Sequence, residues 1–254
     1  MKKLIKIAIS LSMFFILQGC QNNSDSASKV ASKNSHLPMC TDDVEEREGI
    51  FIDWVELANK YNSDSGAQSD YQKALCLYKK ADKVKNAPEA QYYIGVMYFQ
   101  GRGMAVPKDL QQAQQWFLKA ANSEKGMPPA SFALGTMYLD GNGVTQDYKQ
   151  ASEWLEKTGT WSSRDYRDTS SNAFLLLGKM HYHGMGTQKD NKTAFAYFWL
   201  SSFTGNKEAK HDLDILKKEL SKNELNDAMH ITNELNKKFH VLLDSPFPAI
   251  EKKQ

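Results

Sequence analysis

Three cysteines and six histidines are the residues of this sequence best suited to catalysis or metal binding. Thiols and imidazoles act as nucleophiles, metal ligands and proton carriers where two or more stand at a suitable spacing. His181 and His183 lie two positions apart, so on a helix they point to different faces and cannot readily bind one metal ion. No C-x-x-C, G-x-S-x-G or H-E-x-x-H motif occurs. We therefore expect no catalytic centre, metal site or cofactor.

Residues 1–19 have the basic, apolar, small order of a secretory signal peptide. The apolar stretch 7–17 is shorter than the about 20 residues that a membrane-spanning helix needs. The segment Leu17-Gln18-Gly19-Cys20 resembles the lipobox of bacterial lipoproteins, in which the cysteine is lipidated and becomes the first residue of the mature chain. The resemblance implies a lipid at Cys20 and, because Gln21 rather than Asp follows, an outer-membrane anchor facing the periplasm. A chance cysteine behind a leader is the alternative.

The segment 20–37 is predicted to be a flexible tether. It is rich in Ser, Asn and Lys and holds no aromatic residue, so it cannot bury enough apolar surface to become ordered. As a flexible coil, about 16 residues span roughly 22 Å, which would hold a domain clear of lipid headgroups.

The net charge of the mature chain argues against nucleic-acid binding. The whole chain has 32 basic and 30 acidic residues, and the leader contains three of the lysines, so the mature chain would carry a charge of −1. A nucleic-acid-binding domain usually shows a strongly basic patch. No nucleic acid is expected as a partner.

A glycine pattern repeats along the chain, and such repeats decide the fold class before single helices do. The segments GVMYFQGRG (95–103), GTMYLDGNG (135–143) and GKMHYHGMG (178–186) share G-x-M-[YH]-x-x-G-x-G. An acid, an alanine and an aromatic residue follow at matched offsets, namely Asp109, Ala113 and Trp116, then Asp147, Ala151 and Trp154, then Asp190, Ala194 and Tyr197. An earlier degenerate unit fits the same offsets at Tyr61, Gly66, Asp70, Ala74 and Leu77.

Each unit is predicted to form two antiparallel helices. Ala90, Ile94 and Met97 recur at helical spacing in a first helix, where Gly95 suggests that a neighbouring helix passes close. The G-x-G between the helices supplies positive φ and a helix stop, and the following aspartate can cap the next helix. A phosphate-binding loop would need a preceding strand, and no strand is predicted.

The segment 130–154, ASFALGTMYLDGNGVTQDYKQASEW, is similar to the motif of the Sel1-like repeat family, a relative of the tetratricopeptide repeats. The resemblance implies an all-α fold, a right-handed solenoid of helix pairs, with about four units in residues 38–205. Departures from the motif are two extra residues in the loop GMAVPKD, His181 in place of a tyrosine, and a missing first glycine in the first unit.

The tail is predicted to close the array. Residues 209–239 indicate two further helices broken near Ser221, which forms a capping-box pattern with Glu224. We assign residues 206–243 to capping helices, because solenoids need a polar terminal cap, and residues 244–254 to a loose tail.

Lipidation of Cys20 would leave an even pair of cysteines, Cys40 and Cys76, in an oxidising compartment. A disulfide between them would pin the start of the array to its first unit. Two buried free thiols are the alternative.

Solenoids of this class present a concave face built from the first helix of each pair. Register with the tetratricopeptide groove predicts that a protein partner contacts Tyr92, Val96, Phe99, Gln100, Phe132, Thr136, Leu139, Asp140, Leu175, Lys179, Tyr182 and His183. The alternative is that the first residue of each group packs within its own unit.

The segment TWSSRDYRDTSS (160–171) interrupts the repeat period and is predicted to be a loop. Insertions in such arrays often touch a partner, and Trp, Tyr and Arg dominate binding hot spots. Trp161, Arg164, Tyr166 and Arg167 are therefore further candidates for partner binding, with a local spacer as the alternative.

Three classes of function remain open. The first is a lipid-anchored adaptor facing the periplasm, which resembles immunity proteins that block an envelope toxin such as a secreted phospholipase, and also envelope-assembly scaffolds. The second is an enzyme, by analogy with cysteine-rich relatives of β-lactam-binding type. The third is a structural envelope spacer. The sequence favours the first, and it indicates no oligomeric state.

Overall fold

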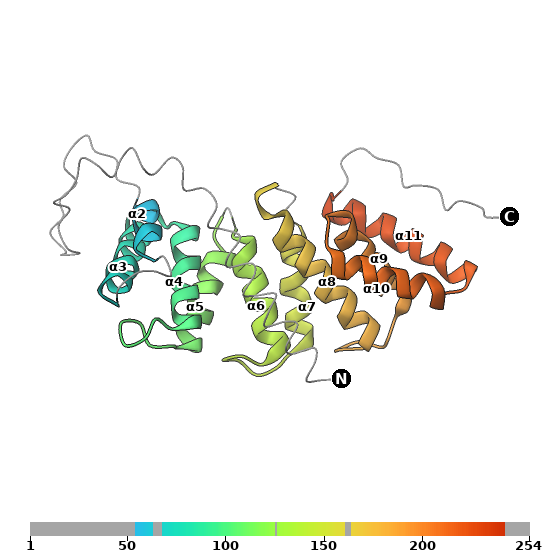
Figure 1. The fold of residues 1–254 in the computed structure, drawn as a ribbon, viewed down its shortest axis with the longest axis horizontal. Coiled ribbons are helices and arrows are strands. Elements are labelled where there is room, and N and C mark those ends of the chain that lie inside the picture. The colour runs from blue at the N-terminus through green and yellow to red at the C-terminus, as the bar shows by residue number, and fades with distance from the viewer. Residues whose placement is uncertain (1–53, 63–67, 125, 161–163, 242–254) are drawn as a thin grey trace. The chain divides into compact units, whose positions relative to one another are not determined.

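The computed structural model describes residues 54–62, 68–124, 126–160 and 164–241. Within these ranges the chain forms ten α-helices and one 3-10 turn and no β-strand, which confirms the all-α class (Figure 1). The helices are α2 (Trp54–Tyr61), α3 (Gln68–Lys85), α4 (Pro88–Gln100), α5 (Leu110–Ala121), α6 (Pro128–Asp140), α7 (Tyr148–Gly159), α8 (Arg167–His183), α9 (Asn191–Phe203), α10 (Lys207–Glu219) and α11 (Lys222–Phe239). The predicted leader and tether lie outside the described residues.

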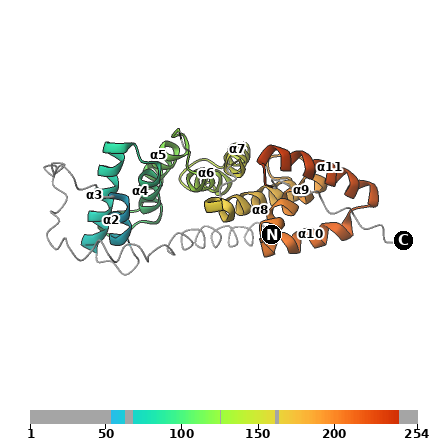
Figure 2. The same cartoon turned by 90° about the horizontal axis from the view of Figure 1, so that it is seen from above.

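The chain divides into two compact units, residues 1–154 and 155–254, with the boundary inside α7. In unit 1, consecutive helices from α2 to α6 pack against one another. In unit 2, α8, α10 and α11 all pack against α9, which lies among them in both views (Figures 1 and 2).

The predicted turn chemistry between the helices of each pair is present. Gly141 and Gly184 end α6 and α8 in the left-handed conformation, with φ of +72° and +67°. At the start of the following helices, one carboxylate oxygen each of Asp109, Asp147 and Asp190 accepts hydrogen bonds from the backbone N–H groups two and three residues later, at 2.9–3.1 Å. Short local patterns therefore specify where each helix ends and the next begins.

Two motif glycines allow the helices of a pair to approach closely, as the sequence predicted for Gly95. A Cβ at Gly95 would lie 2.6 Å from ring carbons of Phe117 on α5. A Cβ at Gly178 would lie 2.5 Å from the ring of Phe198 on α9. Both rings are buried, so neither can move away at low cost.

Gly178→Ala should therefore lower the free energy of unfolding by about 1–3 kcal/mol, because overpacking against Phe198 outweighs the gain of up to about 1 kcal/mol in helix propensity. Chemical denaturation of both proteins measures the difference. The double variant with Phe198→Leu should recover part of the loss. An alanine variant as stable as the wild type would show that the two helices are not in close contact.

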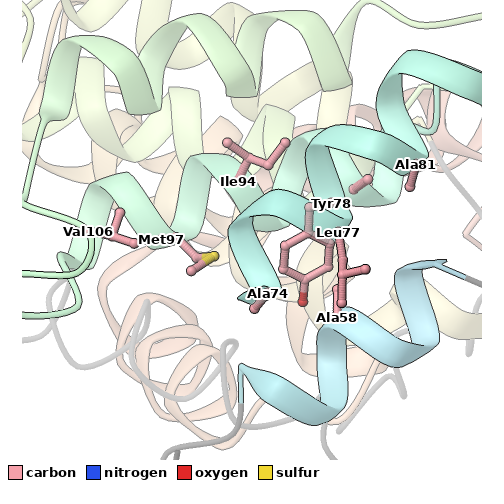
Figure 3. Packing of buried hydrophobic residues seen from close by; sticks show 9 residues of the cluster. Ala58, Ala74, Leu77, Tyr78, Ala81, Ile94, Met97 and Val106 are labelled. Carbon is pink, nitrogen blue, oxygen red and sulfur yellow. The ribbon is translucent and has the colours of Figure 1, made fainter. Parts of the chain in front are cut away.

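The core of unit 1 joins α2, α3 and α4 (Figure 3). Tyr78 of α3 is fully buried beside Ala58 of α2, and its hydroxyl donates a hydrogen bond to Asn59 Oδ1 at 2.5 Å. Cys76, also on α3, is half-buried and disulfide-bonded. Its partner lies outside the described residues, so the pairing with Cys40 stays a prediction.

The end of unit 2 is closed by α11. The predicted capping box is present: Ser221 Oγ accepts from Glu224 N at 3.4 Å, and Glu224 Oε2 accepts from Ser221 N at 2.8 Å. At the far end of α11, the ring of Phe239 is fully buried, with its centroid 5.0 Å from that of Phe174 and 6.4 Å from that of Tyr197. The last turn of α11 is therefore anchored to the repeat helices α8 and α9.

The prediction of a loop over 160–171 is wrong for its second half. Residues Arg164–Tyr166 form a 3-10 turn and α8 begins at Arg167. Ser170 Oγ donates to the carbonyl of Thr158 at 3.2 Å, and Ser171 and Ser201 each donate a hydroxyl to the other's carbonyl, at 3.1 and 2.7 Å. Because these hydroxyls find acceptors on neighbouring helices, the serine-rich stretch extends α8 instead of forming a loop.

Candidate functional site

Five of the predicted groove residues of unit 1 are buried. Tyr92, Val96, Phe132, Thr136 and Leu139 are each at most 5% exposed. The buried state of these side chains favours packing within the chain over contact with a partner. The predicted residues of unit 1 that are half-buried and retain some accessible surface are Phe99, Gln100 and Asp140.

The predicted residues of the third repeat have a different setting. Leu175 is buried, whereas Lys179 and Tyr182 are half-buried and His183 is exposed. Lys179 Nζ forms an ion pair with Glu208 of α10, and the Tyr182 hydroxyl donates to Glu219 Oε1 at 3.5 Å. The last half of α8 therefore faces α10, a helix that was predicted only to cap the array.

A stripe of α10 completes this surface. Glu208, Asp212, Ile215 and Glu219 follow one another at steps of three or four residues, so they share one side of the helix. Two of them contact α8 as just described. We call the surface formed by these four residues with Lys179, Tyr182 and His183 the α8–α10 face.

Tyr182 lies at the centre of the charged groups on the α8–α10 face. Lys189 Nζ is 4.8 Å from its ring centroid, and the His183 ring meets it edge-on with centroids 5.0 Å apart. Desolvation and the neighbouring Glu219 carboxylate raise the pKa of Tyr182. Desolvation, with Lys179 and Lys189 nearby, lowers the pKa of His183 and so favours its neutral imidazole.

Asp212 differs from the other carboxylates of the face. Its side chain is half-buried and makes no hydrogen bond or ion pair with the part of the chain that the structure describes. Burial raises the pKa of Asp212, an effect opposed by Lys179 and reinforced by Glu208. The ionised form therefore carries a desolvation cost that Lys179 offsets only in part.

Asp212→Asn should leave the melting temperature at pH 7 unchanged or raise it. A folded-state pKa above the unfolded value means that ionisation destabilises the fold, so stability contributed by protonated Asp212 is lost as pH rises through its pKa. The neutral amide removes this cost. Thermal melts at pH 5 and pH 7 measure the effect, and a clear fall in melting temperature at pH 7 would show a structural role for the carboxylate.

The two histidines of the third repeat do not form a joint site. His181 stacks on Tyr197, with ring centroids 5.6 Å apart, and desolvation lowers its pKa. His183 projects instead toward Tyr182. In the described ranges, no group of three or more His, Cys, Asp or Glu side chains could hold a metal ion. Similarly, no described helix is both long and apolar enough to cross a membrane.

The structure describes the side chains of only two of the four candidate residues in the segment 160–171. Trp161 lies outside the described residues, and so does the side chain of Arg164. Tyr166 is half-buried and Arg167 is exposed on the first turn of α8. Their role in partner binding stays a prediction.

Sequence reasoning did not identify the α10 residues of the face. The signal was present, because Glu208, Asp212, Ile215 and Glu219 occur at helical spacing in a tail already predicted to be helical. What the sequence could not indicate was that this side of α10 faces α8.

The helix pairs, their glycine turns and their aspartate caps define an α-helical repeat protein. The family model for the Sel1 repeat matches residues 56–81, 88–124, 128–159 and 173–199, so the chain carries an array of four Sel1 repeats. Proteins built from Sel1 repeats are generally protein-interaction scaffolds.

Solved structures that resemble the chain include two repeat proteins. One is c5321, a protective antigen of uropathogenic Escherichia coli with an SLR fold, with 29% identity, a TM-score of 0.59 and coverage of 73% of this chain. The chain spans only 38% of the length of that structure. The other is a Sel1 repeat protein from Oxalobacter formigenes, with 25% identity, a TM-score of 0.55 and coverage of 72% of this chain and 69% of the other. No curated protein sequence matches the chain.

Proposed function

We propose that this chain is a protein-binding module that acts by binding a partner protein. We also propose that the α8–α10 face is a contact surface for that partner. The observation that carries the proposal is the meeting of Lys179, Tyr182 and His183 with the α10 stripe on one partly exposed surface. Tyrosine is enriched at binding hot spots, and interfaces commonly combine an apolar centre with a polar rim.

A matched pair of tyrosine variants tests the role of this face. The partner is first captured from envelope extract with the wild-type chain, identified, purified and titrated by calorimetry. Tyr182→Ala should weaken its binding by about 2 kcal/mol, roughly thirtyfold, if the tyrosine is a hot spot. Tyr148→Ala, at a half-buried tyrosine of α7, should leave the affinity unchanged. Equal effects of the two variants on the affinity would show that the α8–α10 face is not the contact surface for the partner.

The proposal places the module at the cell envelope, held by a lipid on Cys20. Metabolic labelling with a fatty-acid analogue should tag the wild-type chain and not Cys20→Ala, because the cysteine is the residue that carries the lipid in a lipobox. The variant should also move from the membrane fraction to the soluble fraction. Equal labelling of the two chains would contradict lipidation at this residue.

Immunity against an envelope toxin is a specific form of the proposed function. A blocker of an incoming toxin needs affinity rather than catalysis, and a tether of roughly 22 Å would hold it where such a toxin arrives. Deleting the gene should make cells sensitive to kin that carry the cognate toxin, and the purified chain should inhibit that toxin at equal stoichiometry. A deletion strain that competes as well as its parent against all siblings would favour an envelope-assembly scaffold instead.

A further inference from the structure

The interactions across the α8–α10 face leave one carboxylate without a partner among the described residues. At one end Lys179 pairs with Glu208, and at the other Tyr182 donates to Glu219. Asp212 lies between these two on α10 and makes neither a hydrogen bond nor an ion pair within the described chain. Lys179 is the cation with the strongest effect on the Asp212 carboxylate, but its side chain is only 16% exposed and pairs with Glu208. Within the described residues, therefore, no lysine or arginine lies at ion-pair distance from this carboxylate.

The charges around Asp212 favour a cation from outside. The groups that face it are Lys179 and His183 from α8 and Glu208 and His211 from α10. The α8–α10 face holds three carboxylates, Glu208, Asp212 and Glu219, and one lysine, Lys179, while Lys189 lies over the Tyr182 ring beside it. A cationic side chain placed at Asp212 would complete the charge pairing of the face.

An apolar contact point lies one turn along α10 from Asp212. Ile215 is 38% exposed and belongs to the few large apolar side chains of the described residues with that much accessible surface. Its position between Asp212 and Glu219 places apolar surface beside carboxylates. A ligand that fits both features carries a basic group next to an apolar group.

We propose that the α8–α10 face recognises a segment of a protein partner in which an arginine or lysine pairs with Asp212 while a neighbouring apolar side chain covers Ile215. This inference rests on the proposed function, because it names the chemistry of the partner at the same face. A charge-assisted hydrogen bond at a partly desolvated carboxylate strengthens binding more than one at an exposed carboxylate. The apolar contact supplies burial that excludes water from the ion pair.

A displayed library of random twelve-residue peptides, selected on the mature chain, provides the probe. Peptides whose binding is lost with Tyr182→Ala are kept as ligands of the face. These peptides should contain arginine or lysine, and replacing that residue by methionine should weaken binding at least about tenfold. Asp212→Asn should cause the same loss, and the two changes together should cost no more than either alone.

Two further variants sharpen the test. Asp214→Asn removes an exposed α10 carboxylate that pairs with Lys217 at 3.6 Å, and it should leave peptide affinity unchanged. Asp212→Lys should select peptides rich in acidic residues, and this reversal keeps the test informative even if the asparagine variant were poorly folded.

Peptides that need Tyr182 but contain no basic residue, or that bind Asp212→Asn with full affinity, would overturn this inference and leave the proposed function intact. Failure to select any peptide that depends on Tyr182 would count against both.

Discussion

Phe239→Ala should lower the free energy of unfolding by about 3–5 kcal/mol, the range for removing a fully buried aromatic side chain. The ring of Phe239 packs against Phe174 and Tyr197, and a Cβ at Gly159 would lie 3.2 Å from it. Because these groups belong to three other helices, the cavity cannot be filled by movement of one side chain. Urea denaturation followed by circular dichroism measures the loss.

Lys238 provides the control for this prediction. Its Nζ lies 2.7 Å from Glu156 Oε2, but both side chains are substantially exposed, so Lys238→Met should cost less than about 1 kcal/mol. If Phe239→Ala were as mild as the lysine variant, α11 would be a dispensable appendage and not the closing element of unit 2.

Loss of the disulfide at Cys76 should have an effect of similar size. If Cys76 pairs with Cys40, the bond closes a loop of 37 residues, and the chain-entropy model gives a stabilisation of about 4 kcal/mol. Cys76→Ser should therefore lower the melting temperature, and a reductant should lower that of the wild type but not that of the variant.

Mass spectrometry of non-reduced peptides checks the pairing directly. The expected product joins the peptides that contain Cys40 and Cys76. Two alkylatable thiols in the native protein, or a link from Cys76 to Cys20, would contradict it. Cys20→Ala is the matched control, because it removes a thiol without removing the proposed bond.

The parts of the fold that could be predicted from the sequence are those set by short-range chemistry. Gly141 and Gly184 stop helices through positive φ, and the aspartates that follow the glycine turns cap the next helices within three residues. Gly95 was recognised as a point of close approach because glycine has a poor helix propensity. The capping box at Ser221 is equally local.

The parts that could not be predicted depend on contacts between distant positions. The Lys179–Glu208 pair joins residues 29 positions apart, and the Lys238–Glu156 pair joins residues 82 positions apart. Register with related repeats identified Tyr182, but only the packing of α10 reveals the carboxylates opposite it. The second half of the segment 160–171 was misjudged because its serines find acceptors on neighbouring helices that the sequence does not place beside them.

Photo-crosslinking from position 182 tests the central claim, that the α8–α10 face contacts a protein partner, most directly. Benzoylphenylalanine in place of Tyr182 in the full chain should yield one discrete adduct in cells, containing the same protein that copurifies with the wild type. The same probe in place of Tyr148 should yield no such adduct. Absence of an adduct from position 182, or identical adducts from both positions, would contradict the account.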